Sequence, residues 1–216
     1  MGYKLIRSKR RTVALEIKDG ELYVKAPYLA PRFFIERFVL EKRSWIEKTL
    51  KKSKTTRKEM RQYTSGERYL YLGESKILKT IDTGESVAAG NQIVISAKNE
   101  IEVKTKLRKF YKAQTARLIK NYLAKHSNKF GITSPKATYK FYKSKWGSCS
   151  AKNNFSFNAF LSMAPLAAIE YVVIHELAHI THKNHSKSFW AEVEKYDPNY
   201  KTHRKWLREN HHKLSL

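Results

Sequence analysis

The most chemically informative segment of this 216-residue chain is His175-Glu176-Leu177-Ala178-His179, which is followed six residues later by His185. On an α-helix, residues i and i+4 lie on one face, so His175 and His179 project together. Two imidazoles at this spacing can bind one zinc ion. Glu176 lies beside the first imidazole and can accept a proton from a water molecule that the metal activates. The spacing therefore predicts zinc ligands at His175 and His179 and a general base at Glu176.

His185 is the expected third ligand, because it follows the end of the expected helix, where the chain can turn back. Three protein ligands leave one zinc position for water, which is typical of catalytic sites. His182 is an alternative third ligand near the same helix face, and we favour His185. The same histidines could instead be packed, hydrogen-bonded core residues. We favour the metal because unpaired polar groups in a core are costly, and Tyr171-Val172-Val173-Ile174 makes this helix strongly apolar.

The composition is that of a globular protein with an extreme positive charge. Hydrophobic residues make up 41 %, and 44 Lys and Arg against 19 Asp and Glu give a net charge of +25. Such a charge favours a polyanionic partner, either nucleic acid or nucleotide, but a solvated lysine-rich surface would have the same composition. We expect no membrane segment, since no apolar run approaches the ~18 residues needed. The single cysteine, Cys149, fits a reducing compartment, and we expect a cytoplasmic protein.

The first 98 residues are predicted to form a β-rich region with one helix. Residues 12–17 and 21–26 alternate as strands do, and Lys18-Asp19-Gly20 between them is a hairpin signal. A helix is expected after Pro31. Glycines then separate three short strand candidates at 69–72, 76–81 and 92–95.

Residues 99–216 are predicted to form the second domain, which carries the histidine motif. Its expected elements are a long helix at 101–130, strands at 136–142 and 154–160, the motif helix at 166–182, and helices at 186–196 and 198–214. Pro165 suits the start of the motif helix. Ser186 is a candidate N-cap for the next helix, and this cap would hold the turn that delivers His185.

Several segments of this second domain resemble the YgjP-like metallopeptidase family. They are Lys145-Trp146-Gly147-Ser148-Cys149-Ser150, then Asn158, the histidine motif, and Asn184-His185-Ser186-Lys187-Ser188-Phe189-Trp190. The resemblance covers nearly the whole chain and is most specific from Trp146 to Trp190. The WLM-domain proteases look similar and share the ligand spacing, and the SprT-like proteases share the motif helix.

The resemblance implies an α+β fold with a zincin-like C-terminal core. In such a core, a small sheet lies beside the active-site helix, and a second helix brings the third ligand, so that His175, His179 and His185 hold the metal. The N-terminal β-hairpin, its helix and the small β region would precede this core.

Three other residues in the family-like segments have simpler interpretations. Trp146 is expected to pack near the sheet rather than to contact substrate. Cys149 is expected to be a small buried residue, since there is no second cysteine and no evident base for it. Asn158 could support the site or pair with the backbone, and the sequence leaves both open.

The leading functional prediction is a zinc-dependent hydrolase, specifically a metallopeptidase that acts on a peptide or protein. One alternative keeps the metal but makes the enzyme a phosphohydrolase of nucleotides, because activated water also attacks phosphorus. Another alternative is a nucleic-acid-binding protein whose metal site is not catalytic. Glu176 argues against the last, since a structural metal site needs no base.

Overall fold

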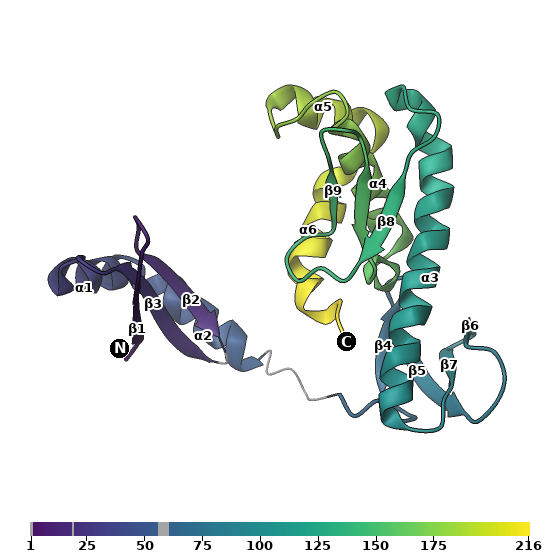
Figure 1. Cartoon of the computed structure of the whole chain (residues 1–216), viewed down its shortest axis with the longest axis horizontal. Coiled ribbons are helices and arrows are strands. Elements are labelled where there is room, and N and C mark those ends of the chain that lie inside the picture. Colours follow the sequence, from purple (N-terminus) through teal and green to yellow (C-terminus); the bar gives the residue numbers. More distant parts are fainter. Residues whose placement is uncertain (1, 19, 56–60) are drawn as a thin grey trace. The chain divides into compact units, whose positions relative to one another are not determined.

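The computed structural model describes residues 2–18, 20–55 and 61–216. The chain divides into two compact units, Met1–Met60 and Arg61–Leu216 (Figure 1). No helix of the described residues is both long enough and apolar enough to cross a membrane.

The N-terminal unit is a three-stranded sheet with two helices. The strand order is β1-β3-β2, in which β2 pairs antiparallel with β3 and β1 pairs parallel with β3. The β2–β3 pairing confirms the predicted hairpin, although Asp19 of its turn lies outside the described residues. The elements are β1 (Lys4–Ser8), β2 (Ala14–Lys18), β3 (Glu21–Pro27), α1 (Arg32–Glu41) and α2 (Arg43–Thr55).

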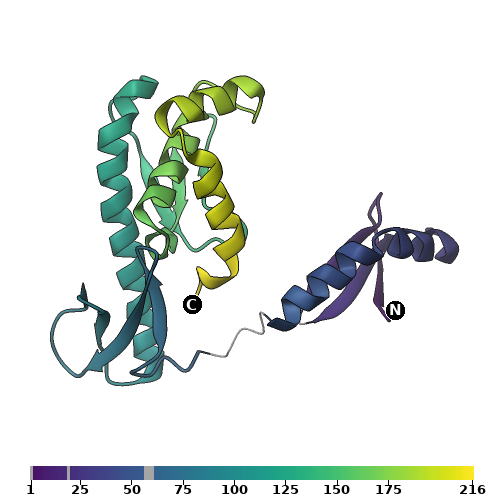
Figure 2. The same ribbon diagram turned by 180° about the vertical axis from the view of Figure 1, so that it is seen from behind.

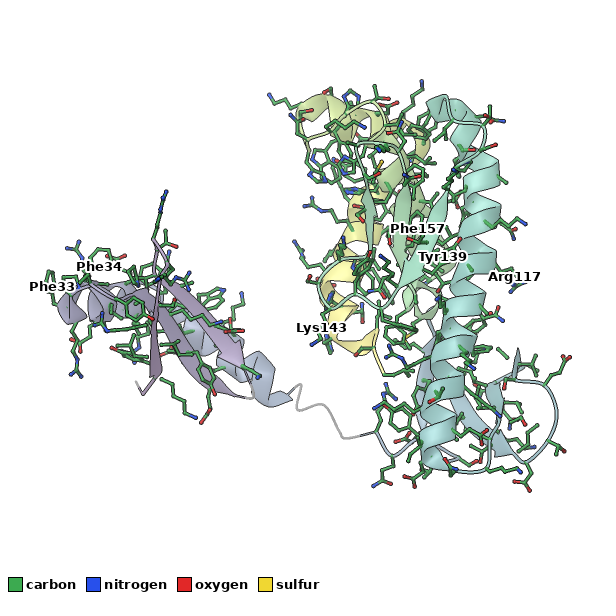
Figure 3. All side chains as sticks on the ribbon, viewed as in Figure 1. Phe33, Phe34, Arg117, Tyr139, Lys143 and Phe157 are labelled. Atoms are coloured by element: carbon green, nitrogen blue, oxygen red, sulfur yellow. The ribbon has the colours of Figure 1, made fainter. Side chains whose placement is uncertain are left out.

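The core of this unit is small. Alternate residues of β3 are buried, as expected for a strand with one face toward a core. They pack with Ile35 and Val39, which are one helical turn apart on α1, and with Ile46 of α2. Phe33 and Phe34 of α1 remain mostly exposed, at 73 % and 53 % (Figure 3). In place of the single helix expected after Pro31, the structure has two helices, α1 and α2. Phe33 and Phe34 are not the main contacts of α1 with the core.

The C-terminal unit contains two further small sheets and most of the helices. One sheet has the order β4-β5-β7-β6 and the other β8-β10-β9. Its strands are β4 (Arg68–Tyr71), β5 (Glu74–Ile81), β6 (Val87–Ala89), β7 (Gln92–Ser96), β8 (Ala137–Lys140), β9 (Gly147–Cys149) and β10 (Phe155–Asn158). Its α-helices are α3 (Glu100–His126), α4 (Leu166–Ala178), α5 (Lys187–Tyr196) and α6 (Tyr200–Asn210). Three short 3-10 segments complete it: η1 (Ser127–Phe130), η2 (Leu161–Met163) and η3 (His211–Lys213). The chain therefore has a mixed α+β fold.

Helix α3 connects the two sheets of this unit (Figure 1 and Figure 2). It begins where the Asn99 side chain accepts a hydrogen bond from the backbone N–H of Glu102 at 3.0 Å, and the Glu102 carboxylate accepts one from Lys98. Its buried residues recur every three or four positions, as one helix face requires. The Tyr139 hydroxyl of β8 reaches the Ala116 carbonyl of α3, which places this sheet against the helix (Figure 3).

The structure groups residues 61–98 with the C-terminal unit, whereas the sequence suggested a boundary after residue 98. The backbone N–H groups of Leu72 and Gly73, between β4 and β5, donate to the carbonyls of Ser162 and Met163 just before α4. Gly73 has a positive φ of 85°, and a Cβ there would come within 2.7 Å of Pro165. The strands of 68–96 share one hydrophobic core with α3 and α4. This small sheet therefore supports the start of the motif helix.

Helix α4 is central to the unit, because α3, α5, α6 and β9 all pack on it. Nine of its residues are buried, among them a continuous run from Tyr171 to Ile174. The helix ends at Ala178 and has His179 as its C-cap, four residues earlier than the predicted end at 182. A helix that is apolar on nearly all sides requires such a surrounding shell.

Candidate metal centre

Three imidazoles converge at the C-terminal end of α4. Ligand atoms of His175, His179 and His185 all lie within 4.8 Å of one another, and the Nε2 atoms of His175 and His185 are 3.1 Å apart. The ring centroids are 4.8 to 5.1 Å apart. The tertiary structure thus brings together the three histidines that the sequence singled out.

Local backbone structure explains how these side chains converge. His175 lies in the last turn of α4, and His179 keeps helical backbone angles as the C-cap, so the i, i+4 relation survives. The chain then turns, and Ser186 caps α5 by accepting a hydrogen bond from the Phe189 N–H at 3.4 Å. This confirms the predicted cap and places His185 directly before it.

The side chain of His182 lies elsewhere. Its Nε2 pairs with the Glu192 carboxylate of α5 at 2.8 Å, and its Nδ1 lies 3.4 Å from the Ser188 hydroxyl. Its backbone carbonyl, in contrast, lies 2.9 Å from the Nδ1 of His179. His182 therefore supports the cluster through its main chain and through its contact with α5.

The outer contacts orient the rings. A proton on Nδ1 of His179 would be donated to the His182 carbonyl, which leaves the Nε2 lone pair free. The Tyr171 hydroxyl is 3.4 Å from the Nδ1 of His175. Phe189 is fully buried, and its ring lies 4.7 to 5.0 Å from all three imidazoles, so it forms an apolar floor. This set of second contacts is typical of metal-binding imidazoles.

Burial favours the neutral form, which a metal needs, in two of the three imidazoles. Burial, together with the smaller effects of His179, His185 and Arg204, lowers the pKa of His175 to about 3. Burial likewise lowers the pKa of His185, again with help from His179 and Arg204. Only neutral imidazole has a lone pair for a metal, and ligands must lose their protons before binding.

Glu176 is a buried carboxyl beside this cluster. Its residue is only 5 % exposed, and burial raises its pKa to about 8, although Lys145 opposes the shift. Gly147 of β9 lies against its side chain: a Cβ on Gly147 would be 2.5 Å from Oε1 and 2.7 Å from Cγ of Glu176. Because the φ of Gly147 is not in the left-handed region, space alone explains the need for glycine here.

Asn158 holds the segment that leads into β9. Its side-chain N–H group donates to the carbonyls of Tyr142 and Lys145, at 3.0 and 3.1 Å, and its backbone N–H donates to Trp146. Asn158 is itself buried. Asn158 therefore pairs with the backbone, which is one of the two roles that the sequence left open. Because the segment it holds leads to Gly147, this pairing also influences where Glu176 can lie.

Trp146 and Cys149 are not part of the histidine cluster. Trp146 packs against the hydrophobic core and makes an edge contact with the His211 ring at 5.0 Å. Cys149 is a free, half-buried thiol whose pKa is raised by burial. A thiol with a raised pKa is a poor nucleophile, as expected, but Cys149 is half-buried rather than buried as the sequence suggested.

The residues present fit a divalent metal ion. Two nitrogen ligands at the usual zinc distance of about 2.0–2.1 Å in a tetrahedron are about 3.3–3.4 Å apart. The observed 3.1 Å between the Nε2 atoms of His175 and His185 is close to this value. The donor set of three imidazoles is one that zinc accepts and that calcium and magnesium avoid.

The family model of the YgjP-like metallopeptidase domain matches residues 11–210. The chain belongs to this family. Membership in a YgjP-like metallopeptidase family implies a metal ion, and the histidine cluster is a suitable place for it within the described residues.

One solved structure similar to this YgjP-like chain is the crystal structure of the metallopeptidase zymogen of Pyrococcus abyssi abylysin. The two chains are 26 % identical, and the match covers 44 % of this chain and 93 % of that chain, with a TM-score of 0.36. No curated protein matches the chain.

Sequence reasoning about this YgjP-like chain missed three residues around the centre. Phe189, Trp190 and Gly147 were noted only as parts of the family-like segments. Phe189 and Trp190 offered a weak signal, because they lie on the helix that directly follows the third histidine. The contact of Gly147 with Glu176 left no signal in the spacing, since 28 residues separate the two.

Proposed function

We propose that this protein is a zinc-dependent peptidase in which His175, His179 and His185 hold the metal and Glu176 is the general base. The observation that carries the proposal is the convergence of three imidazoles beside one buried carboxyl. When bound, zinc supplies Lewis-acid polarisation of the scissile carbonyl and makes water more acidic.

The residues of the chain perform the remaining steps. The lowered pKa values of His175 and His185 keep these two imidazoles unprotonated at neutral pH. Glu176 in its carboxylate form takes the proton of the attacking water and passes it to the nitrogen of the leaving amine. Gly147 limits where the Glu176 carboxylate can lie, and Asn158 holds the strand that carries Gly147. The Phe189 floor keeps water from the inner side of the histidines.

The buried carboxyl supports this proposal over a non-catalytic metal site, and the metallopeptidase family supports it over a phosphohydrolase. A metal site without catalysis needs no carboxyl held this closely by a glycine. A phosphohydrolase would use the same metal and base, and the substrate alone would distinguish it.

The experiment is an activity panel with the zinc-loaded full chain. It includes casein and mixed peptides, a set of nucleoside triphosphates, and single- and double-stranded DNA in binding and cleavage assays. We expect peptide cleavage that disappears with a chelator and falls roughly 10²–10⁴-fold in Glu176→Gln, with zinc retained. Nucleotide hydrolysis without peptide cleavage would identify the phosphohydrolase, and DNA binding with no hydrolysis would identify the non-catalytic protein.

A further inference from the structure

A row of four cations lies on one face of α6, the helix that packs on α4. Lys201, Arg204, Lys205 and Arg208 are spaced i, i+3, i+4 and i+7, so their side chains share one helix face. We call these four residues the α6 cation row. Helix α6 packs directly on the helix that carries His175.

The α6 cation row lines a pocket with an aromatic wall. The cavity has a volume of about 370 Å³, and Trp190 of α5 and Tyr200 complete its lining. The rings of these two residues are stacked, with centroids 5.2 Å apart at 15°. The guanidinium carbon of Arg204 lies 4.7 Å from the centre of the Trp190 ring, a cation–π contact that holds the arginine in place.

The Trp190 ring also forms the link to the metal centre. The indole ring also stacks on the His185 ring, with centroids 5.7 Å apart and an interplanar angle of 27°, and its centroid lies 5.7 Å from that of His175. Arg204 and His185 therefore contact the same indole ring. The charge of Arg204 lies close enough to influence both histidines electrostatically.

Most of the positive charge in this pocket is not neutralised. Lys201 lies 3.5 Å from the Glu194 carboxylate. Within the described residues, Arg204, Lys205 and Arg208 form no ion pair with any carboxylate. Elsewhere on this chain, exposed arginines such as Arg32, Arg37 and Arg43 each pair with a glutamate one turn away. Because three cations in one cavity have no acidic partner, the ligand that this cavity fits best is an anionic group.

We propose that the α6 cation row is a substrate subsite that binds a carboxylate of the peptide, either an acidic side chain or the C-terminus. This inference rests on the proposed peptidase function. An extended peptide advances about 3.3–3.6 Å per residue, so a carboxylate two or three residues from the cleaved bond reaches past Trp190. A guanidinium binds a carboxylate through two parallel hydrogen bonds, which gives direction as well as affinity.

The test compares peptide libraries that differ at one position. In each pair, glutamate or glutamine stands at a fixed distance from the cleaved bond, and a further pair has a free or an amidated C-terminus. The enzymes are the wild type, Arg204→Gln/Arg208→Gln, and the control Lys109→Gln/Lys112→Gln. The control removes the same charge from two exposed lysines on α3. The Arg204→Lys variant keeps the charge and serves as a rescue.

We expect the wild type to prefer one carboxylate position about tenfold or more in kcat/KM, since hydrogen bonds to charged groups are the stronger ones. Arg204→Gln/Arg208→Gln should lose this preference, measured as the ratio of kcat/KM for the glutamate peptide to that for the glutamine peptide, so that any change common to both peptides cancels. The lysine control should keep it, and Arg204→Lys should restore part of it. Arg204→Glu/Arg208→Glu should favour a lysine at the same position. A preference for glutamate over glutamine would identify a side-chain carboxylate as the ligand, and a preference for the free over the amidated C-terminus would identify the terminal carboxylate.

Binding supplies a readout independent of turnover. In the Glu176→Gln background, fluorescence anisotropy of the labelled glutamate peptide should give a Kd about tenfold lower than that of the glutamine peptide. The proposal fails if peptides are cleaved with no carboxylate preference, or if the preference survives in Arg204→Gln/Arg208→Gln. If no peptide is cleaved and a nucleoside triphosphate is hydrolysed instead, the peptidase function itself fails, and the two failures are thus distinct.

Discussion

Two kinds of histidine site occur within the C-terminal unit, and the difference between them is instructive. His126, His182 and His203 each face a carboxylate, from Glu170, Glu192 and Asp197, at 2.7 to 2.9 Å. The three histidines of the metal centre have no carboxylate partner within the described residues, and instead face one another.

Burial does not distinguish the two kinds of site. His126 is only 3 % exposed, yet its Nε2 is bonded to Glu170, so this nitrogen is not available to a metal. His185 is exposed, yet its Nε2 points at the Nε2 of His175. The two kinds of site therefore differ in what a ring nitrogen faces: a carboxylate in His126, His182 and His203, and another imidazole in His175 and His185.

The largest expected effect comes from replacing one histidine of each kind. His185→Ala removes an inner ligand, so the zinc affinity should fall by more than the roughly 10–100-fold that loss of an outer partner causes. His182→Ala keeps the backbone carbonyl that lies against His179, so zinc should remain bound. Competition with a chromophoric chelator measures both affinities. Zinc lost from His182→Ala and retained by His185→Ala would reverse the assignment.

The next effect concerns the carboxyl of the centre. Gly147→Ala places a methyl group where Glu176 now lies, so the carboxylate must move while the histidines stay. A displacement of this kind costs up to about 10²-fold in rate, and we expect a loss of 10–100-fold in kcat with full zinc content. Ser148→Ala, at the neighbouring position, is the matched control and should change little.

A double variant distinguishes this contact from general damage to the fold. Glu176→Asp shortens the side chain and should make room for the added methyl group. The combined variant Gly147→Ala/Glu176→Asp should then lose less kcat than the product of the two single losses. Strictly multiplicative losses would mean that the two residues act independently.

The smallest effect belongs to the structural pairs. Burial raises the pKa of Glu170, but hydrogen bonds from Lys125 and His126 more than offset this, and the net pKa is lowered. A lowered folded-state pKa adds stability above the unfolded value near 4.5, and this stability is lost as the pH falls through the folded pKa. Glu170→Gln should therefore cost about 1 kcal/mol of unfolding free energy at neutral pH.

Urea unfolding of the metal-free protein at a series of pH values checks this prediction. The difference in unfolding free energy between wild type and Glu170→Gln should shrink as the pH falls below about 4.5. At low pH the wild-type carboxyl is protonated and therefore uncharged, like the glutamine of the variant. Zinc affinity should be the same in the two proteins. A constant gap down to acid pH would show that the ion pair contributes nothing.

The sequence alone determined the parts of this protein that depend on local spacing. The i, i+4 relation of His175 and His179 holds for any helix, so the motif predicted which residues converge. The alternation of strand residues predicted the β2–β3 hairpin, and the Ser186 cap followed from residue type. Most expected elements lie within a few residues of their observed bounds, but strands β1, β6 and β9 were not predicted.

Tertiary structure decided what depends on contacts between distant segments. Residues 61–98 read as a continuation of the N-terminal region, but Gly73 packs on Pro165, and the sheet joins the core of α4. The choice between His182 and His185 depended on Glu192, which lies on another helix. No local pattern encodes these pairings, because each is set by how whole elements pack rather than by the period of one of them.

The surroundings of the centre belong to this second class. Strand β9 is only three residues long, and it places Gly147 against Glu176 because Asn158 holds the preceding loop. The α6 cation row follows from helical spacing, but its contact with the indole ring that stacks on His185 depends on the packing of α5 and α6 around Trp190. The sequence thus specified the three histidines of the candidate metal centre, and the packing of β9, α5 and α6 determined where the carboxyl lies and what charge surrounds it.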